Sequence, residues 1–111
     1  MTITTSYLAV DGNNPNALLI ANGVPKWYTG RCCKLLAPDW DDVKRHKETG
    51  DTILFTKHYL AKLDKLGIDK VLSVLTDGDV LLCYEKPGDF CHRHILASWL
   101  REHGVTIERE G

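Results

Sequence analysis

The segment that most restricts the possible folds is the apolar run Val-Leu-Leu-Cys-Tyr at residues 80–84. A run of this kind is typical of a strand that is covered on both faces, as strands of parallel sheets are. A turn follows, then a helical pattern over residues 90–103 and an alternating segment at 105–107. Strand, helix and strand in this order form a βαβ unit, whose two strands are parallel. The sequence therefore predicts an α/β domain built on a parallel sheet.

The rest of the chain supplies further elements for the same sheet. Residues 3–10 are rich in β-branched and aromatic side chains, and residues 17–21 are a short apolar run, so both are predicted to be strands. Together the elements predict a single domain over residues 1–111, a small three-layer α/β fold with a mainly parallel sheet of about four strands. Helical turns are expected at residues 40–46, 51–66 and 69–75, and the expected N-capping residues are Asp51, Asp69 and Asp89.

Composition and charge exclude several classes of protein. A chain with 43% hydrophobic and 26% charged residues is ordinary for a globular domain and unlike a disordered chain or a coiled coil. Fourteen basic and fifteen acidic residues give a net charge of −1, so no overall field favours nucleic acid or a membrane surface. No apolar run approaches the roughly 20 residues that cross a bilayer, and the first residues lack the basic start of a secretory signal. We expect a cytoplasmic protein that does not bind membranes.

The four cysteines are expected to be reduced thiols rather than disulfides. Cys32 and Cys33 are adjacent, and Cys83 lies within the apolar run, where a buried thiol packs as a small hydrophobe. A chain without a secretory signal is expected in a reducing compartment, where structural disulfides are rare.

The densest group of reactive side chains follows the apolar strand. Glu85 lies just after it, and Cys91, His92 and Arg93 are expected on the first turn of the next helix. In parallel sheets, ligands bind where strands end and helices begin, because helix N-termini offer free N–H groups and partial positive charge. We expect Cys91 to be a nucleophile or acid–base group and His92 to move its proton, while Arg93 holds an anion and Glu85 orients a partner. His94 is expected on the outer, solvated face.

The same residues raise the question of a metal site. Cys83, Glu85, Cys91 and His92 carry the right ligand atoms. Adjacent residues of a helix diverge by roughly 100°, however, and no Cys-x-x-Cys pair is present. We therefore expect no metal at these residues and no cofactor.

A second group lies in residues 26–38, which show no periodicity and are predicted to form a long loop. Lys26, Trp27 and Arg31 are expected to bind substrate, with Trp27 and Arg31 closing over it. The same loop offers an alternative, in which its cations and aromatic rings bind a single-stranded nucleic acid. In a further interpretation, Trp27 and Tyr28 seal one end of the core and the cations face water.

The residues after the apolar strand carry a family resemblance. Leu-Cys-Tyr-Glu-Lys-Pro at 82–87, followed by Cys91-His92-Arg93 at a helix start, resembles the signature of the domain-of-unknown-function 488 family. The resemblance covers residues 17–103 and is closest to the short members. It implies a small α/β sandwich and a cytoplasmic prokaryotic or phage setting, but it implies no activity. Residues 25–31 and 36–38 also resemble the family.

One departure from the family pattern concerns charge. Many relatives have an Asp-Val-Arg element a few residues before the proline that matches Pro25. In this chain Ile20 and Asn22 occupy the positions of the acid and the arginine. If those charges bind substrate in relatives, this chain binds it differently or has lost the activity.

Three functions from different classes follow from these patterns. The first is an enzyme that acts on a small anionic or nucleotide-like substrate at the Cys91-His92-Arg93 site. The alternative is a non-catalytic module that binds a ligand or a nucleic acid through the same pocket and the loop at residues 26–34. The third is a structural role, in which Glu85, His92 and Arg93 form a buried polar network. The sequence identifies neither the substrate nor the oligomeric state.

Overall fold

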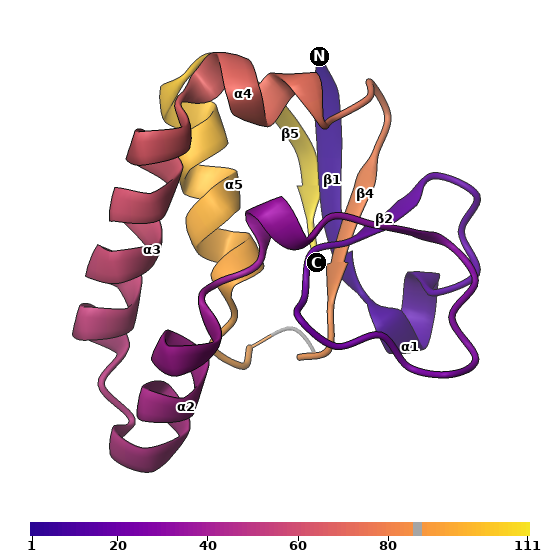
Figure 1. Ribbon diagram of the computed structural model, residues 1–111. Helices are drawn as coiled ribbons and strands as arrows, with labels where there is room; N and C mark the ends of the chain where they lie inside the picture. The colour runs from indigo at the N-terminus through magenta and orange to yellow at the C-terminus, as the bar shows by residue number, and fades with distance from the viewer. Residues whose placement is uncertain (86–87) are drawn as a thin grey trace.

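A five-stranded, all-parallel sheet forms the centre of the computed structural model, which describes residues 1–85 and 88–111 (Figure 1). The strand order is β3-β2-β4-β1-β5. This architecture confirms the predicted α/β fold with a mainly parallel sheet and adds one strand to the expected number. The strands are β1 (Thr2–Tyr7), β2 (Ala17–Leu19), β3 (Arg31–Cys32), β4 (Val80–Cys83) and β5 (Thr106–Glu110).

The predicted βαβ unit is the part of the fold that positions the site. It consists of β4, the helix α5 (His92–Glu102) and β5, with β1 lying between the two strands of the unit. In β4, Leu81 pairs with Thr5 of β1 on one side and with Leu18 of β2 on the other. All four residues of β4 are buried, which confirms that the apolar run is a central strand covered on both faces.

Helices cover one face of the sheet, and a short helix with a loop covers the other. On the first face, Leu81 packs in a core with Leu63 of α3 and Leu96 of α5. On the second face, Leu82 packs with Leu8 of α1 and with Tyr28. Figure 1 shows α2, α3 and α5 together on one side, well away from α1. The remaining helices are α1 (Leu8–Asp11), η1 (Lys34–Leu36), α2 (Trp40–Thr49), α3 (Thr52–Leu66) and α4 (Ile68–Ser73).

The N-caps differ from the prediction at two of three positions. Asp51 caps α3 as expected, because its carboxylate accepts a hydrogen bond from the Leu54 N–H at 3.0 Å. The residue before α4 is Gly67, so Asp69 lies within the helix rather than at its cap. Helix α5 is capped by Cys91 and not by Asp89, which shifts its start two residues beyond the predicted position.

The loop predicted at residues 26–38 contains two short elements. β3 occupies Arg31–Cys32 and η1 follows at Lys34–Leu36. A strand of two exposed residues carries no periodic signal, so the sequence alone does not reveal it. The predicted first strand also ends earlier, at Tyr7, where α1 begins. The turn predicted at Pro87 lies partly outside the described residues.

None of the helices in the described ranges is long and apolar enough to span a membrane.

Candidate functional site

A cavity of about 730 Å³ opens at the edge where β2 and β4 end. Its walls come from the segment after β2, from α2 and α3, and from the chain between β4 and the start of α5. This is the sheet edge at which α/β proteins commonly bind ligands. The lining residues include the aromatic side chains Trp40, Phe55, Tyr84 and Phe90, together with Asn22, His46, Lys47, Cys83, Glu85, Cys91 and His92.

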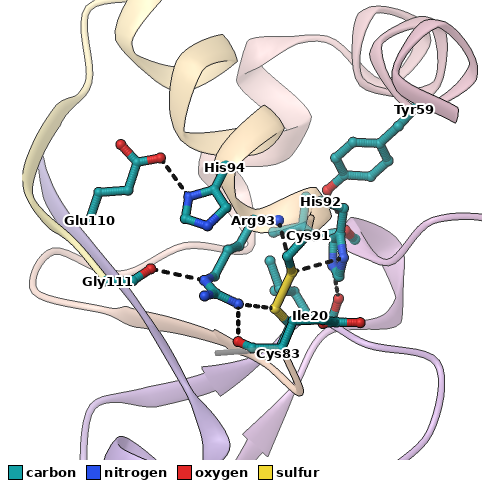
Figure 2. Close-up of a disulfide and its surroundings, with 11 residues drawn as sticks. Ile20, Tyr59, Cys83, Cys91, His92, Arg93, His94, Glu110 and Gly111 are labelled. Atoms are coloured by element: carbon teal, nitrogen blue, oxygen red, sulfur yellow. Dashed lines mark hydrogen bonds and ion pairs between the residues drawn. A yellow bond between two sulfur atoms is a disulfide. The ribbon is translucent and has the colours of Figure 1, made fainter. Parts of the chain in front are cut away.

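Cys83 and Cys91 are joined by a disulfide in the wall of this cavity (Figure 2). The prediction that all cysteines are reduced is therefore wrong for this pair, whereas Cys32 and Cys33 are free thiols. The physical reason is the fold. Cys83 is the last residue of β4 and Cys91 caps α5, and the end of this strand and the start of this helix lie at the same edge of the sheet. The sequence indicated that Cys83 lies in the middle of a buried strand. The structure places Cys83 at the end of that strand, in the wall of the cavity.

Cys91 is held at the helix N-terminus in an extended conformation, with φ −150° and ψ 143°. Its Sγ accepts a hydrogen bond from the Arg93 N–H at 3.5 Å and lies 3.7 Å from Nδ1 of His92. The prediction that neighbouring helical positions diverge does not apply here, because Cys91 precedes the helix. The sulfur and the imidazole of two adjacent residues consequently face each other, as Figure 2 shows.

His92 is buried and held by its second ring nitrogen. Its Nε2 faces the backbone carbonyl of Ile20 within hydrogen-bond distance, and the Tyr59 ring packs against it edge to face at 5.4 Å. A carbonyl can only accept, so Nε2 carries the proton and Nδ1 has a free lone pair. Burial lowers the pKa of His92 to about 4, although the Ile20 carbonyl opposes the shift. Near neutral pH, His92 is therefore an uncharged base whose lone pair faces Cys91.

Arg93 is completely buried, and the cavity lining drawn from the described residues does not include it. Its Nη1 donates to Sγ of Cys83 at 2.6 Å and to the carbonyl oxygen of Glu85. Its Nε donates to the carbonyl of Gly111 at 3.1 Å, and within the described residues Nη2 has no partner. Burial lowers the pKa of Arg93, while the charge of Glu85 raises it. The structure brings Arg93 to the cysteines, but the described cavity wall does not include it, so its role as an anion clamp stays a prediction.

Glu85 and His94 flank this centre. Glu85 is exposed and lines the cavity, as expected for a residue just past the strand. His94 is half-buried and its Nδ1 lies 2.8 Å from a carboxylate oxygen of Glu110, outside the cavity lining. The predicted outward orientation of His94 agrees with this contact to β5.

The three predicted substrate-binding residues lie elsewhere. Lys26, Trp27 and Arg31 are exposed, and the cavity lining drawn from the described residues includes none of them. Arg31 forms an ion pair of 2.5 Å with Asp79, which precedes β4 and therefore lies at the opposite edge of the sheet from Cys83.

Trp27 and Tyr28 pack at the second face of the sheet. The Trp27 ring lies so close to Gly12 that a Cβ there would approach it to 2.4 Å. Tyr28 is buried in the core of that face, and its hydroxyl donates to the Arg31 carbonyl at 2.6 Å. This arrangement corresponds to the interpretation in which these two rings seal one end of the core. The binding roles of Lys26, Trp27 and Arg31 stay predictions, and they concern a surface away from the cavity.

The cavity also has an aromatic wall that the sequence did not indicate. The His46 and Phe90 rings stack at 4.7 Å, and Phe55 meets Phe90 edge to face at 5.2 Å. Trp40 is 56% exposed, and the Lys47 ammonium lies 5.8 Å from its ring centroid. The available signal was Phe90, an aromatic residue directly before Cys91. The other rings come from α2 and α3 through tertiary packing.

Ile20 and Asn22, the two positions that the family resemblance singled out for their lack of charge, lie beside the same cavity. The carbonyl of Ile20 holds His92, and Asn22 lines the cavity while its amide donates to the carbonyl of Pro38 at 2.8 Å. An arginine in place of Asn22 would therefore stand in the cavity wall. Lys47 supplies a cation to that wall.

Cys83, Cys91 and His92 are also a possible set of metal ligands, because one ligand atom from each lies within 4.8 Å of the others. Thiolate and imidazole suit zinc and other soft cations. Both sulfurs are bonded to each other in this structure, so metal binding would require prior reduction.

Comparison with known proteins gives one match. Residues 16–104 match the family model DUF488-N3a, described as the active DUF488-N3 subclade. Neither the curated proteins nor the solved structures include a significant match to the chain.

Proposed function

The chain belongs to the DUF488-N3a family, and on this premise we propose that it is an enzyme for a small, anionic, nucleotide-like substrate, with reduced Cys91 as its nucleophile. One observation carries the proposal: Sγ of Cys91 lies 3.7 Å from a neutral, well-oriented imidazole in the wall of a cavity of about 730 Å³. The description of the subclade as active supports a chemical rather than a purely structural role.

The residues around Cys91 suit the formation of a thiolate. Once the disulfide is reduced, Nδ1 of His92, which is uncharged in the resting protein, can accept the Cys91 proton as the thiol attacks the substrate, since Nε2 is committed to the Ile20 carbonyl. The Arg93 N–H and the positive end of the α5 dipole then stabilise the thiolate at the helix N-terminus. Cys91 is thereby prepared to attack an electrophilic carbon of a substrate bound in the cavity.

The cavity wall supports a planar, negatively charged substrate. Its volume lies within the usual range of about 300–1,000 Å³ for small-molecule sites. Exposed Trp40 and the stacked pair of His46 and Phe90 offer flat surfaces for a heteroaromatic ring. Lys47 offers a cation for a phosphate or carboxylate next to that ring, and Glu85 offers a carboxylate for a ring N–H or a sugar hydroxyl. In this proposal Lys47 takes the anion-binding role predicted for Arg93, while Arg93 positions the two sulfurs.

A protection experiment on the reduced protein tests the proposal. Nucleoside mono- and diphosphates are added before iodoacetamide, and the labelling of each cysteine is followed by peptide mass spectrometry. A nucleotide that binds the cavity should slow labelling of Cys91 while leaving exposed Cys32 unchanged as an internal control. Substitution Trp40→Ala should remove the protection. If every nucleotide leaves Cys91 labelling unchanged, the nucleotide-like substrate is wrong.

A second candidate function rests on the loop outside the cavity. Lys26, Trp27, Arg31 and Lys34 are all exposed, which supports a separate surface for single-stranded nucleic acid. Binding through these cations should weaken steeply as salt is added, because phosphate neutralisation releases counterions. A salt-independent affinity for an oligonucleotide would argue against this alternative.

A further inference from the structure

We propose that Cys83 and Cys91 form a reversible dithiol–disulfide centre that exchanges with low-molecular-weight thiols and disulfides entering the cavity. In this exchange Cys91 forms the mixed disulfide and Cys83 is the resolving thiol. The inference goes beyond the proposed function because it requires no nucleotide, although both use Cys91.

The position of the pair gives the exchange its access. The disulfide joins residues eight apart in the sequence, and both residues line the cavity. Cys91 precedes α5, so its sulfur lies at the positive end of a helix of eleven residues. A thiol in this position is favoured as a thiolate, which is the form that exchanges with disulfides. Both cysteines are almost fully buried, so the cavity that they line is the route by which we expect a small thiol to approach the sulfurs.

The two sulfurs have different partners, and this difference assigns their roles. Sγ of Cys83 accepts a hydrogen bond of 2.6 Å from the buried guanidinium of Arg93. Sγ of Cys91 instead faces the uncharged imidazole of His92 at 3.7 Å. A cation stabilises a departing thiolate, and thiols that are more acidic leave faster in exchange. Figure 2 shows these different partners of the two sulfurs. Attack on Cys91 with departure of Cys83 is therefore the favoured direction.

The exchange balances with a small thiol as the reductant. A thiolate attacks Sγ of Cys91 and forms a mixed disulfide, the Cys83–Cys91 bond breaks, and its electron pair moves to Cys83 beside Arg93. A second thiolate attacks the small-molecule sulfur of the mixed disulfide, which releases the oxidised small molecule and leaves Cys91 as a thiolate. The two protons of the small thiols end on solvent or on the cysteines. In total, the protein disulfide gains two electrons and two small thiols lose them.

The exchange also decides when the proposed nucleophile is available. In the disulfide form Sγ of Cys91 is bonded to Cys83, so it cannot attack a substrate. Reduction frees Cys91 and leaves Cys83 held by Arg93. The same centre would therefore link the activity of the site to the thiol redox state around it.

A glutathione titration tests the inference on the whole chain. The Cys32→Ser protein is equilibrated without oxygen in mixtures of glutathione and glutathione disulfide, quenched in acid, alkylated and mapped by mass spectrometry. The expected result is a reversible change of Cys83 and Cys91 together, as a single two-electron couple, without denaturant. A pair that stays reduced in every mixture, or a disulfide that is reduced only after unfolding, would overturn the proposal.

Two single substitutions test the assignment of roles. In Cys83→Ser, the mixed disulfide with glutathione should accumulate on Cys91 because nothing resolves it. In Cys91→Ser, Cys83 should react more slowly, by about tenfold or more, because a thiolate that Arg93 stabilises is a good leaving group but a weaker nucleophile. Equal modification of the two remaining thiols, or faster modification of Cys83, would contradict the assignment. Circular dichroism of both variants checks that they are folded.

The two proposals fail separately. The glutathione titration uses no nucleotide, and the nucleotide protection experiment uses fully reduced protein. A reversible couple without nucleotide protection would retain the exchange centre and remove the substrate proposal. Nucleotide protection of Cys91 in a protein whose Cys83 and Cys91 never form a disulfide would retain the substrate proposal and remove the exchange centre.

Discussion

Nδ1 of His92 lies 3.7 Å from Sγ of Cys91, although the two residues are neighbours in the sequence. This approach is possible because Cys91 has extended backbone angles while His92 begins the helix. The Ile20 carbonyl at the other ring nitrogen fixes which tautomer faces the sulfur. Three parts of the chain therefore fix the contact between Cys91 and His92: the residue after β2, the extended residue before α5 and the first residue of α5.

The first prediction concerns the reactivity of Cys91. In reduced protein, we expect iodoacetamide to label Cys91 well below the pH at which an ordinary thiol reacts, because the Arg93 backbone N–H and the N-terminus of α5 favour the thiolate. His92→Gln should slow this labelling at neutral pH on the order of tenfold, since it removes the base and keeps a donor for the Ile20 carbonyl. Peptide mass spectrometry over a pH series measures both rates. Identical pH profiles for Cys91 and exposed Cys32 would contradict an activated thiol.

The second prediction concerns stability against pH. Burial lowers the pKa of His92 to about 4 in the folded protein, whereas it is close to 6.5 when the chain is unfolded. As the pH falls below about 6.5, His92 binds a proton in the unfolded chain. In the folded protein, His92 does not bind this proton until the pH nears 4. The free energy of unfolding should therefore fall by roughly 3 kcal/mol between neutral pH and about pH 4 because of His92 alone. This contribution is fully present above the unfolded pKa.

Urea denaturation at several pH values measures this contribution. His92→Gln has no titrating group at this position, so its free energy of unfolding should fall less steeply over the same range. The carboxylates titrate in both proteins and cancel in the comparison. Parallel curves for the parent and His92→Gln would mean that His92 is solvated or already protonated in the fold.

The third prediction separates the two exposed tryptophans. Trp40 lines the cavity and is 56% exposed, whereas Trp27 is 53% exposed and lies against Gly12 at the end of α1, on the other face of the sheet. Trp40→Ala should weaken nucleotide protection of Cys91 by about tenfold, in keeping with roughly 1–3 kcal/mol for stacking on one aromatic side chain. Trp27→Ala should leave the protection unchanged. A loss of protection in Trp27→Ala alone would mean that the loop at residues 26–38 binds the substrate, as the sequence predicted.

The fold was predictable where a single segment carries the pattern. The apolar residues of β4 and the amphipathic face of α5 each have a local periodicity, and together they imply the parallel sheet. β3 was not predictable, because two exposed residues join the sheet only through pairing with β2. The register of strands far apart in the sequence decides such an element, and no local pattern encodes that register.

The candidate site was predictable in outline and not in its contacts. The rule that ligands bind at the end of parallel strands placed Glu85, Cys91 and His92 together, and all three line the cavity. The burial of Arg93 was anticipated only in the structural interpretation, in which Arg93 belongs to a buried polar network. Its partners were not predictable, because they are Sγ of Cys83 and the backbone carbonyls of Glu85 and Gly111 rather than a carboxylate. The aromatic wall was missed for a similar reason, since α2 reaches the cavity only through tertiary packing.

The last prediction concerns Arg31, which the sequence assigned to substrate binding. The structure places it against Asp79, a carboxylate only 2% exposed that also accepts the Thr76 N–H at 2.8 Å. Arg31→Ala leaves this buried carboxylate without its charged partner, so the free energy of unfolding should fall by roughly 1–3 kcal/mol. Half-exposed Arg31 is partly screened by water, which favours the lower end of that range.

Lys26→Ala is the matched control, because Lys26 is exposed on the same loop and a surface substitution of this kind changes stability by roughly 0.5 kcal/mol or less. Urea denaturation compares the two variants with the parent, and nucleotide protection of Cys91 is measured in all three. We expect Arg31→Ala to be less stable with unchanged protection, because the ion pair and the cavity lie at opposite edges of the sheet. Lost protection with unchanged stability would instead mean that Arg31 reaches the substrate and that the Asp79 ion pair contributes little to the fold.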